Sequence, residues 1–207
     1  WACYGQNYGS VMSCNNVGIG YNTMRYMDGG GFLRNTVVGA RAMFGCDSAS
    51  QYITTANCVR DNIFLGAQAA AWAGWYCGSG VCGIHENIGI GYRALGGARC
   101  ACCSVAVGSN ALYRGCLQQC LPVVIGPYSA NSSMTGACCF RAGVVIGPYN
   151  ACWGGSHMGV IIGTMATRNS KGTANVVVGY QAHCQGGSSQ SSVTSRCNVI
   201  LGTYAGK

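Results

Sequence analysis

The sequence is short of charged residues. Of its 207 residues only 8% are charged, and the acids number four: Asp28, Asp47, Asp61 and Glu86. An ordinary soluble domain carries roughly 25% charged residues. Because 49% of the chain is hydrophobic, a compact globule of this composition would tend to aggregate. We therefore expect an elongated protein whose side surface is partly covered by other chains.

Several further absences exclude whole classes of protein. The 34 glycines follow no three-residue period, which excludes collagen. The 12 basic residues are scattered, and because a phosphate-tracking site needs clustered cations, we expect no nucleic-acid partner. No apolar run is long enough to span a bilayer, so we expect no membrane insertion of this segment. With Trp1 first and no signal peptide, the sequence is expected to be a processed chain or an internal fragment.

What the sequence does have is an internal repeat. A small or polar residue is followed by three mostly apolar residues, Gly, two variable residues and a small residue. The ten copies are NVGIGYNT (16–23), NTVVGARA (35–42), NIFLGAQA (62–69), NIGIGYRA (87–94), SVAVGSNA (104–111), PVVIGPYS (122–129), GVVIGPYN (143–150), GVIIGTMA (159–166), NVVVGYQA (175–182) and NVILGTYA (198–205). Their glycines are at least 16 residues apart, which indicates one repeat unit with inserts of variable length.

The columns of the repeat predict a strand that is apolar on both faces. The residue before the Gly is Ile, Val or Leu in every copy, and the residue two positions earlier is aliphatic except at Thr36. These two columns share one face of a strand, and the column between them faces the other way. One face would fill the interior of a coil, and the other would need to meet something else, for which a sister chain is the simple candidate.

The remaining columns predict how the coil turns. We single out the ten structural glycines as positions that permit a left-handed turn or a close backbone approach: Gly20, Gly39, Gly66, Gly91, Gly108, Gly126, Gly147, Gly163, Gly179 and Gly202. Ala ends seven copies, where a small side chain suits a corner. Asn opens six, and stacked Asn residues can form hydrogen bonds between coils.

These features predict an all-β protein, a parallel β-solenoid of about ten short repeats over residues 16–207, preceded by a lead-in segment at 1–15. No unit can bury a core alone, but ten stacked units can. The alternative is a β-sandwich or barrel built from hairpins. Asn-Gly, the strongest signal for a tight hairpin, does not occur.

The repeats resemble those of two families of trimeric fibres. SVAVGSNA (104–111) resembles the head repeats of trimeric autotransporter adhesins, and NVVVGYQA (175–182) and NTVVGARA (35–42) resemble repeats of phage tail fibres and tail adhesins. The resemblance covers 16–205. It implies a left-handed β-roll, a homotrimer, and an extracellular place on a virion tail or a cell surface. The long inserts and the many cysteines depart from the family pattern.

From this resemblance we expect a structural or adhesive fibre segment and no enzyme. Its expected partners are a host cell-surface glycan or protein and other fibre or tail proteins. The first setting is a phage tail fibre, and the alternative is a bacterial surface adhesin head. A third, a polysaccharide-degrading tailspike, would need two nearby carboxylates, for which only Asp47 and Asp61 share an insert.

The 16 cysteines all lie outside the ten motifs, and their role stays open. They would suit disulfides between coils in an oxidising setting, or unpaired positions in loops. A zinc site could combine Cys100 and Cys103, spaced C-x-x-C, with Cys116 and Cys120. Alternatively, some of these positions are occupied by Ser, Thr or Ala, which have similar bulk and which peptide mass spectrometry would reveal.

No residue is assigned a catalytic, cofactor-binding or metal-binding role from the sequence. GSGVCG (78–83) matches a dinucleotide fingerprint, but a repeat strand follows it instead of a helix. We expect His85, His157 and His183 to be ordinary loop histidines. The candidate contact residues are Trp72, Trp75, Tyr76 and Trp153, for which packing at a coil cap or a seam between chains is the alternative.

Overall fold

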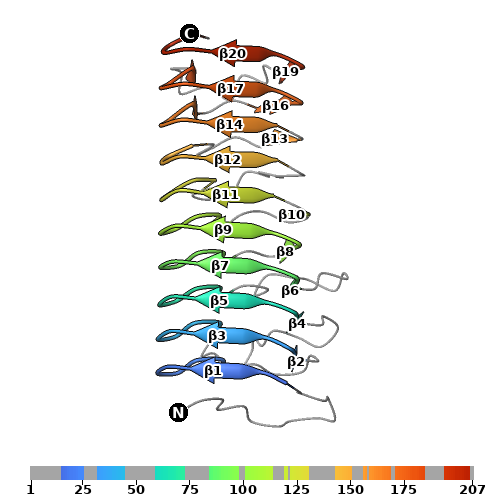
Figure 1. Ribbon diagram of the computed structural model, residues 1–207, viewed down its shortest axis with the longest axis vertical. Coiled ribbons are helices and arrows are strands. Elements are labelled where there is room, and N and C mark those ends of the chain that lie inside the picture. The colour runs from blue at the N-terminus through green and yellow to red at the C-terminus, as the bar shows by residue number, and fades with distance from the viewer. Residues whose placement is uncertain are drawn as a thin grey trace.

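The chain folds as a stack of parallel β-coils (Figure 1). The computed structural model describes residues 15–25, 32–44, 59–72, 84–97, 101–113, 119–120, 122–130, 143–150, 156–157, 159–168, 171–184 and 194–205. Within these ranges every strand pairing is parallel and no helix occurs, so none could span a membrane. The predicted all-β solenoid is confirmed, and the sandwich of hairpins is wrong.

One sheet runs the full length of the stack and takes one strand from each of the ten repeats. Its strands follow the order of the chain. They are β1 (Val17–Ile19), β3 (Thr36–Val38), β5 (Ile63–Leu65), β7 (Ile88–Ile90), β9 (Val105–Val107), β11 (Val123–Ile125), β12 (Val144–Ile146), β14 (Val160–Ile162), β17 (Val176–Val178) and β20 (Val199–Leu201).

Shorter sheets lie outside the repeat motifs. The first contains β2 (Phe32–Leu33), β4 (Val59–Arg60), β6 (Ile84–His85), β8 (Ala101–Cys102) and β10 (Gln119–Cys120). The second contains β13 (Ser156–His157), β16 (Lys171–Thr173) and β19 (Thr194–Arg196), and the third contains β15 (Thr167–Arg168) and β18 (His183–Cys184). The strands of the first two short sheets each lie two residues before a repeat strand, whereas β15 and β18 follow the repeat motifs of β14 and β17.

The middle residue of each repeat strand fills the inside of its coil. Val37, Phe64, Val124 and Val145 are fully buried there, and the column contributes to one continuous core. The largest residue of the column, Phe64, is followed by the smallest, and a Cβ added at Gly89 would lie 2.9 Å from the Phe64 ring in the neighbouring coil. The sequence left open which face points inward, and the structure assigns it to this column.

The repeat glycines stand where two coils approach most closely. All ten have φ between +114° and +140°, a region that side chains rarely adopt. At Gly91, for example, a Cβ would lie 2.6 Å from the carbonyl oxygen of Gly108 in the next coil. The corner residue three positions on is buried in the first nine repeats, and at Thr23 its hydroxyl donates to the carbonyl of Gly39, 2.7 Å away.

A ladder of asparagines links the coils from inside. Asn35, Asn62 and Asn87 are fully buried. The Nδ2 of Asn62 donates to Asn35 Oδ1 at 2.8 Å and to the carbonyl of Ile84 at 2.8 Å. The Oδ1 of Asn62 accepts from both the backbone and the side-chain nitrogen of Asn87, at 3.0 and 2.9 Å. Each buried amide is therefore satisfied by the coils on either side.

Replacing Asn62 by Ala is expected to destabilise the stack by about 2–4 kcal/mol. It removes the side-chain donor to the Ile84 carbonyl, the acceptor of the Asn87 backbone nitrogen and one of the two acceptors of Asn87 Nδ2, all of them buried. Asn198→Ala is the control, since Asn198 occupies the same column but is exposed. Denaturant unfolding of the two variants measures the difference. Equal midpoints would show that the ladder contributes little.

Candidate interaction surface

The outward face of the ten-stranded sheet is a surface that is aliphatic at every position but one, and we call it the aliphatic face. It consists of the first and third residues of every repeat strand. These are Val17, Ile19, Thr36, Val38, Ile63, Leu65, Ile88, Ile90, Val105, Val107, Val123, Ile125, Val144, Ile146, Val160, Ile162, Val176, Val178, Val199 and Leu201, so Thr36 alone is polar.

The aliphatic face is solvent-exposed in the single chain, although none of these side chains belongs to the coil interior. Ile125, Ile146 and Ile162 are 37–39% exposed in the middle of the stack. The face is ten strands high, at about 4.8 Å per strand, and three residues wide, at about 3.3 Å per residue, which gives an area of roughly 500 Å². The largest contiguous apolar patch on a soluble monomer covers about 300–600 Å² and is often a functional site.

Exposed tyrosines border the aliphatic face on the far side of the repeat glycines. Tyr128 and Tyr149 lie in neighbouring coils with their rings stacked, 5.3 Å between centroids, and both are exposed. Tyr180 and Tyr204 meet edge to face at 5.6 Å. Such rings combine apolar area with a hydrogen-bonding hydroxyl, which suits the rim of an interface.

The opposite wall of the stack has a different surface. The five-stranded sheet turns Leu33, Arg60, His85 and Cys102 outward, in register from coil to coil. This column mixes apolar, cationic and polar side chains. Comparing these two sheets as the structure describes them, the face of the ten-stranded sheet is suited to burial against protein and that of the five-stranded sheet to solvent.

Of the aromatic residues singled out from the sequence, the structure describes Trp72. It is half-buried, and the guanidinium of Arg93 lies 5.9 Å from its ring and 4.9 Å from the ring of Tyr92. Trp72 thus lies against a cation in the next coil, not as an open platform. Trp75, Tyr76 and Trp153 lie outside the described residues.

A second surface feature lies at the corner before each repeat motif. In four successive coils this corner residue is Arg34, Asp61, Glu86 and Cys103, each with φ between +52° and +60°. Because the position recurs in each coil, the four residues lie in one column along the axis. We call them the corner column. Arg34 donates two hydrogen bonds to Asp61, at 2.6 and 2.9 Å, and this pairing lowers the pKa of the Asp61 carboxyl.

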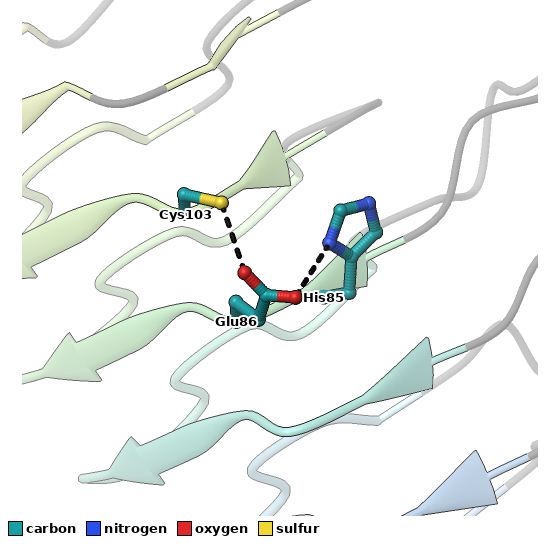
Figure 2. Close-up of side chains that lie close together, drawn as sticks. All are labelled: His85, Glu86 and Cys103. Carbon is teal, nitrogen blue, oxygen red and sulfur yellow. Dashed lines mark hydrogen bonds and ion pairs between the residues drawn. The ribbon is translucent and has the colours of Figure 1, made fainter.

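The same column brings three metal-ligating side chains together (Figure 2). Cys103 Sγ donates to Glu86 Oε2 at 3.1 Å, and Glu86 Oε1 lies 3.9 Å from Nδ1 of His85. One ligand atom from each residue lies within 4.8 Å of the other two. His85 Nδ1 is buried and has no hydrogen-bond partner.

Sequence reasoning missed this cluster, although a signal was present. Glu86 and Cys103 each precede the first residue of a motif, as Arg34 and Asp61 do. An alignment of that position across the repeats predicts that each of these residues lies beside the equivalent residue of the next coil.

Other candidate residues from the sequence fall outside the described residues. These are the lead-in residues 1–14, Asp28, Asp47, the GSGVCG segment (78–83), and Cys100 and Cys116 of the suggested zinc site. Of His157, His183 and Cys120 the structure describes the backbone alone. Cys197, in the described part of the chain, is an exposed free thiol.

The chain was also compared with known proteins. No family model, no curated protein and no solved structure matches it.

Proposed function

We propose that this chain is a structural segment of a homotrimeric extracellular fibre, in the setting of a phage tail fibre that contacts a host surface. The aliphatic face carries the proposal. It runs through all ten coils, and in the single chain its central isoleucines are more than a third exposed. Covering such a surface removes apolar area from water and is therefore favourable.

A second copy of the same chain is the occupant that fits this face best. The face repeats once per coil, so a partner must offer apolar side chains at the same spacing over ten coils. A sister chain has that spacing by construction, and its own aliphatic face has the same need for cover. The number three, and a left-handed winding, come from the resemblance of the repeats to trimeric β-rolls.

The work of such a segment is mechanical. Stacked coils joined by backbone hydrogen bonds and the asparagine ladder form a stiff rod, and the inserts between motifs supply surface for contact with a host glycan or protein. No reaction is part of this proposal.

The direct test is the mass of the native protein, by native mass spectrometry or sedimentation. We expect three times the 21.4 kDa of one chain. A stable single chain would overturn the proposal. Peptide mass spectrometry of the particle from which the chain is isolated then tests the setting: sheath, tube or capsid proteins support a phage tail, and outer-membrane or secretion proteins contradict it.

A further inference from the structure

We propose that His85, Glu86 and Cys103 bind one divalent ion of the zinc type, which fastens the coil of β6 to the coil of β8. This site goes beyond the proposed function and does not depend on it. It also departs from the expectation, drawn from the sequence, that the chain has no metal site.

The geometry is close to that of a bound site. Ligand atoms around a tetrahedral Zn²⁺ ion are roughly 3.3–3.7 Å apart, as its bond lengths of about 2.0–2.3 Å require. In the described structure the sulfur of Cys103 is 3.1 Å from Glu86 Oε2, and Glu86 Oε1 is 3.9 Å from His85 Nδ1. Small side-chain rotations would thus bring all three atoms around one ion, and Figure 2 shows the carboxylate between the other two.

The unsatisfied imidazole nitrogen is an independent sign of a missing ligand. Buried polar atoms in proteins almost always have a partner. In the described part of the chain two buried side-chain atoms lack one, His85 Nδ1 and Thr167 Oγ1. Nδ1 faces the carboxylate of Glu86, so an ion bound there would satisfy it.

Charge and ligand chemistry point to the same class of ion. One thiolate and one carboxylate balance a divalent cation, and Asp61, the next acid in the corner column, is already paired with Arg34. Sulfur and imidazole nitrogen favour Zn²⁺ and its neighbours over Ca²⁺ or Mg²⁺. Glu86 and Cys103 lie at the surface, so water can fill the fourth position.

Binding needs no oxidant or reductant. The Cys103 thiol releases its proton to solvent, and the sulfur donates its lone pair to the ion while the charge of the metal stays at +2. His85 and Glu86 belong to one coil and Cys103 to the next. The bound ion is therefore a cross-link along the fibre axis, and it stabilises that coil boundary by mass action.

Cobalt titration of the reduced, untagged full-length chain tests the site, because thiolate-bound Co²⁺ has a charge-transfer absorption in the near ultraviolet. Cys103→Ser is compared with Cys197→Ser. Cys197 is the matched control, because it occupies the equivalent corner position and is exposed. Its φ is +55°, and that of Cys103 is +52°.

We expect the wild type and Cys197→Ser to bind a Co²⁺ ion that Zn²⁺ displaces, with matching absorption. In Cys103→Ser that absorption should be lost, and His85→Gln should weaken binding at least about tenfold. Equal titrations of the two Cys variants, whether both bind or neither does, would overturn the proposal. Circular dichroism establishes that the variants are folded. If Cys103→Ser does not fold, the cobalt titration of His85→Gln decides the question.

Discussion

The double substitution Ile125→Asp and Ile146→Asp is expected to convert the proposed trimer into single folded chains. The two residues are register partners on β11 and β12, and both side chains point away from the coil interior. In a trimer the double substitution places six carboxylates in an apolar seam. Burying an unpaired charge costs several kcal/mol, so the sum exceeds what such an interface supplies. Sedimentation velocity measures the change in mass.

The control for this prediction is Leu33→Asp, which makes the same chemical change at an outward position of the opposite wall. It should leave the mass unchanged. Val124→Asp makes the change at the neighbour of Ile125 on β11, whose side chain points into the coil and is fully buried, and should prevent folding. If the double variant kept the mass of the wild type, the aliphatic face would not be the seam between the chains.

Alanine at Gly91 is expected to destabilise the stack by about 2–5 kcal/mol, the combined effect of an unfavourable φ and of overpacking. The φ of Gly91 is +127°, and the new Cβ would lie 2.6 Å from the carbonyl oxygen of Gly108, which is backbone and cannot rotate away. The guanidinium concentration at the unfolding midpoint measures the effect.

Two matched substitutions separate strain from crowding. At Gly202, φ is +117° but the nearest atom to an added Cβ is 3.8 Å away. The loss of stability in Gly202→Ala should therefore come from the unfavourable φ alone. At Gly89 φ is not positive and an added Cβ meets the side chains of Phe64 and Leu95, not backbone. Gly89→Ala should therefore cost less than Gly91→Ala, about 1–3 kcal/mol from overpacking. Equal losses at Gly89 and Gly91 would contradict the close approach of the coils.

The repeat strands were predictable because each copy carries the same pattern at the same place. Identical columns from Val17 to Leu201 can pair only in parallel and in register, so the ten-stranded sheet follows from the sequence. The two-residue strands of the other wall were not predictable. Phe32–Leu33 and Ala101–Cys102 lie in inserts of different length and share no pattern beyond one inward apolar residue.

The corner geometry was also beyond the sequence. Met24, Leu95 and Leu112 have φ between +52° and +57°, which their residue types do not favour. Their side chains are buried in the core, and Leu95 and Leu112 donate backbone hydrogen bonds to the next coil at 3.0 and 2.9 Å. Contacts between coils therefore outweigh the local preference. The cluster of His85, Glu86 and Cys103 depends on the same long-range register.

The links between coils have a mechanical consequence, because they lie along the long axis of the stack (Figure 1). A pull along that axis loads the coil boundaries in series, while the bonds within one boundary share the load in parallel. The tension that the rod withstands is therefore set by its weakest boundary, whatever the number of coils. Where the repeat opens with Pro122, Gly143 or Gly159 that column has no Asn. The corner residues Ser129 and Asn150 supply side-chain links there instead, donating to the carbonyls of Gly147 and Gly163 in the next coil.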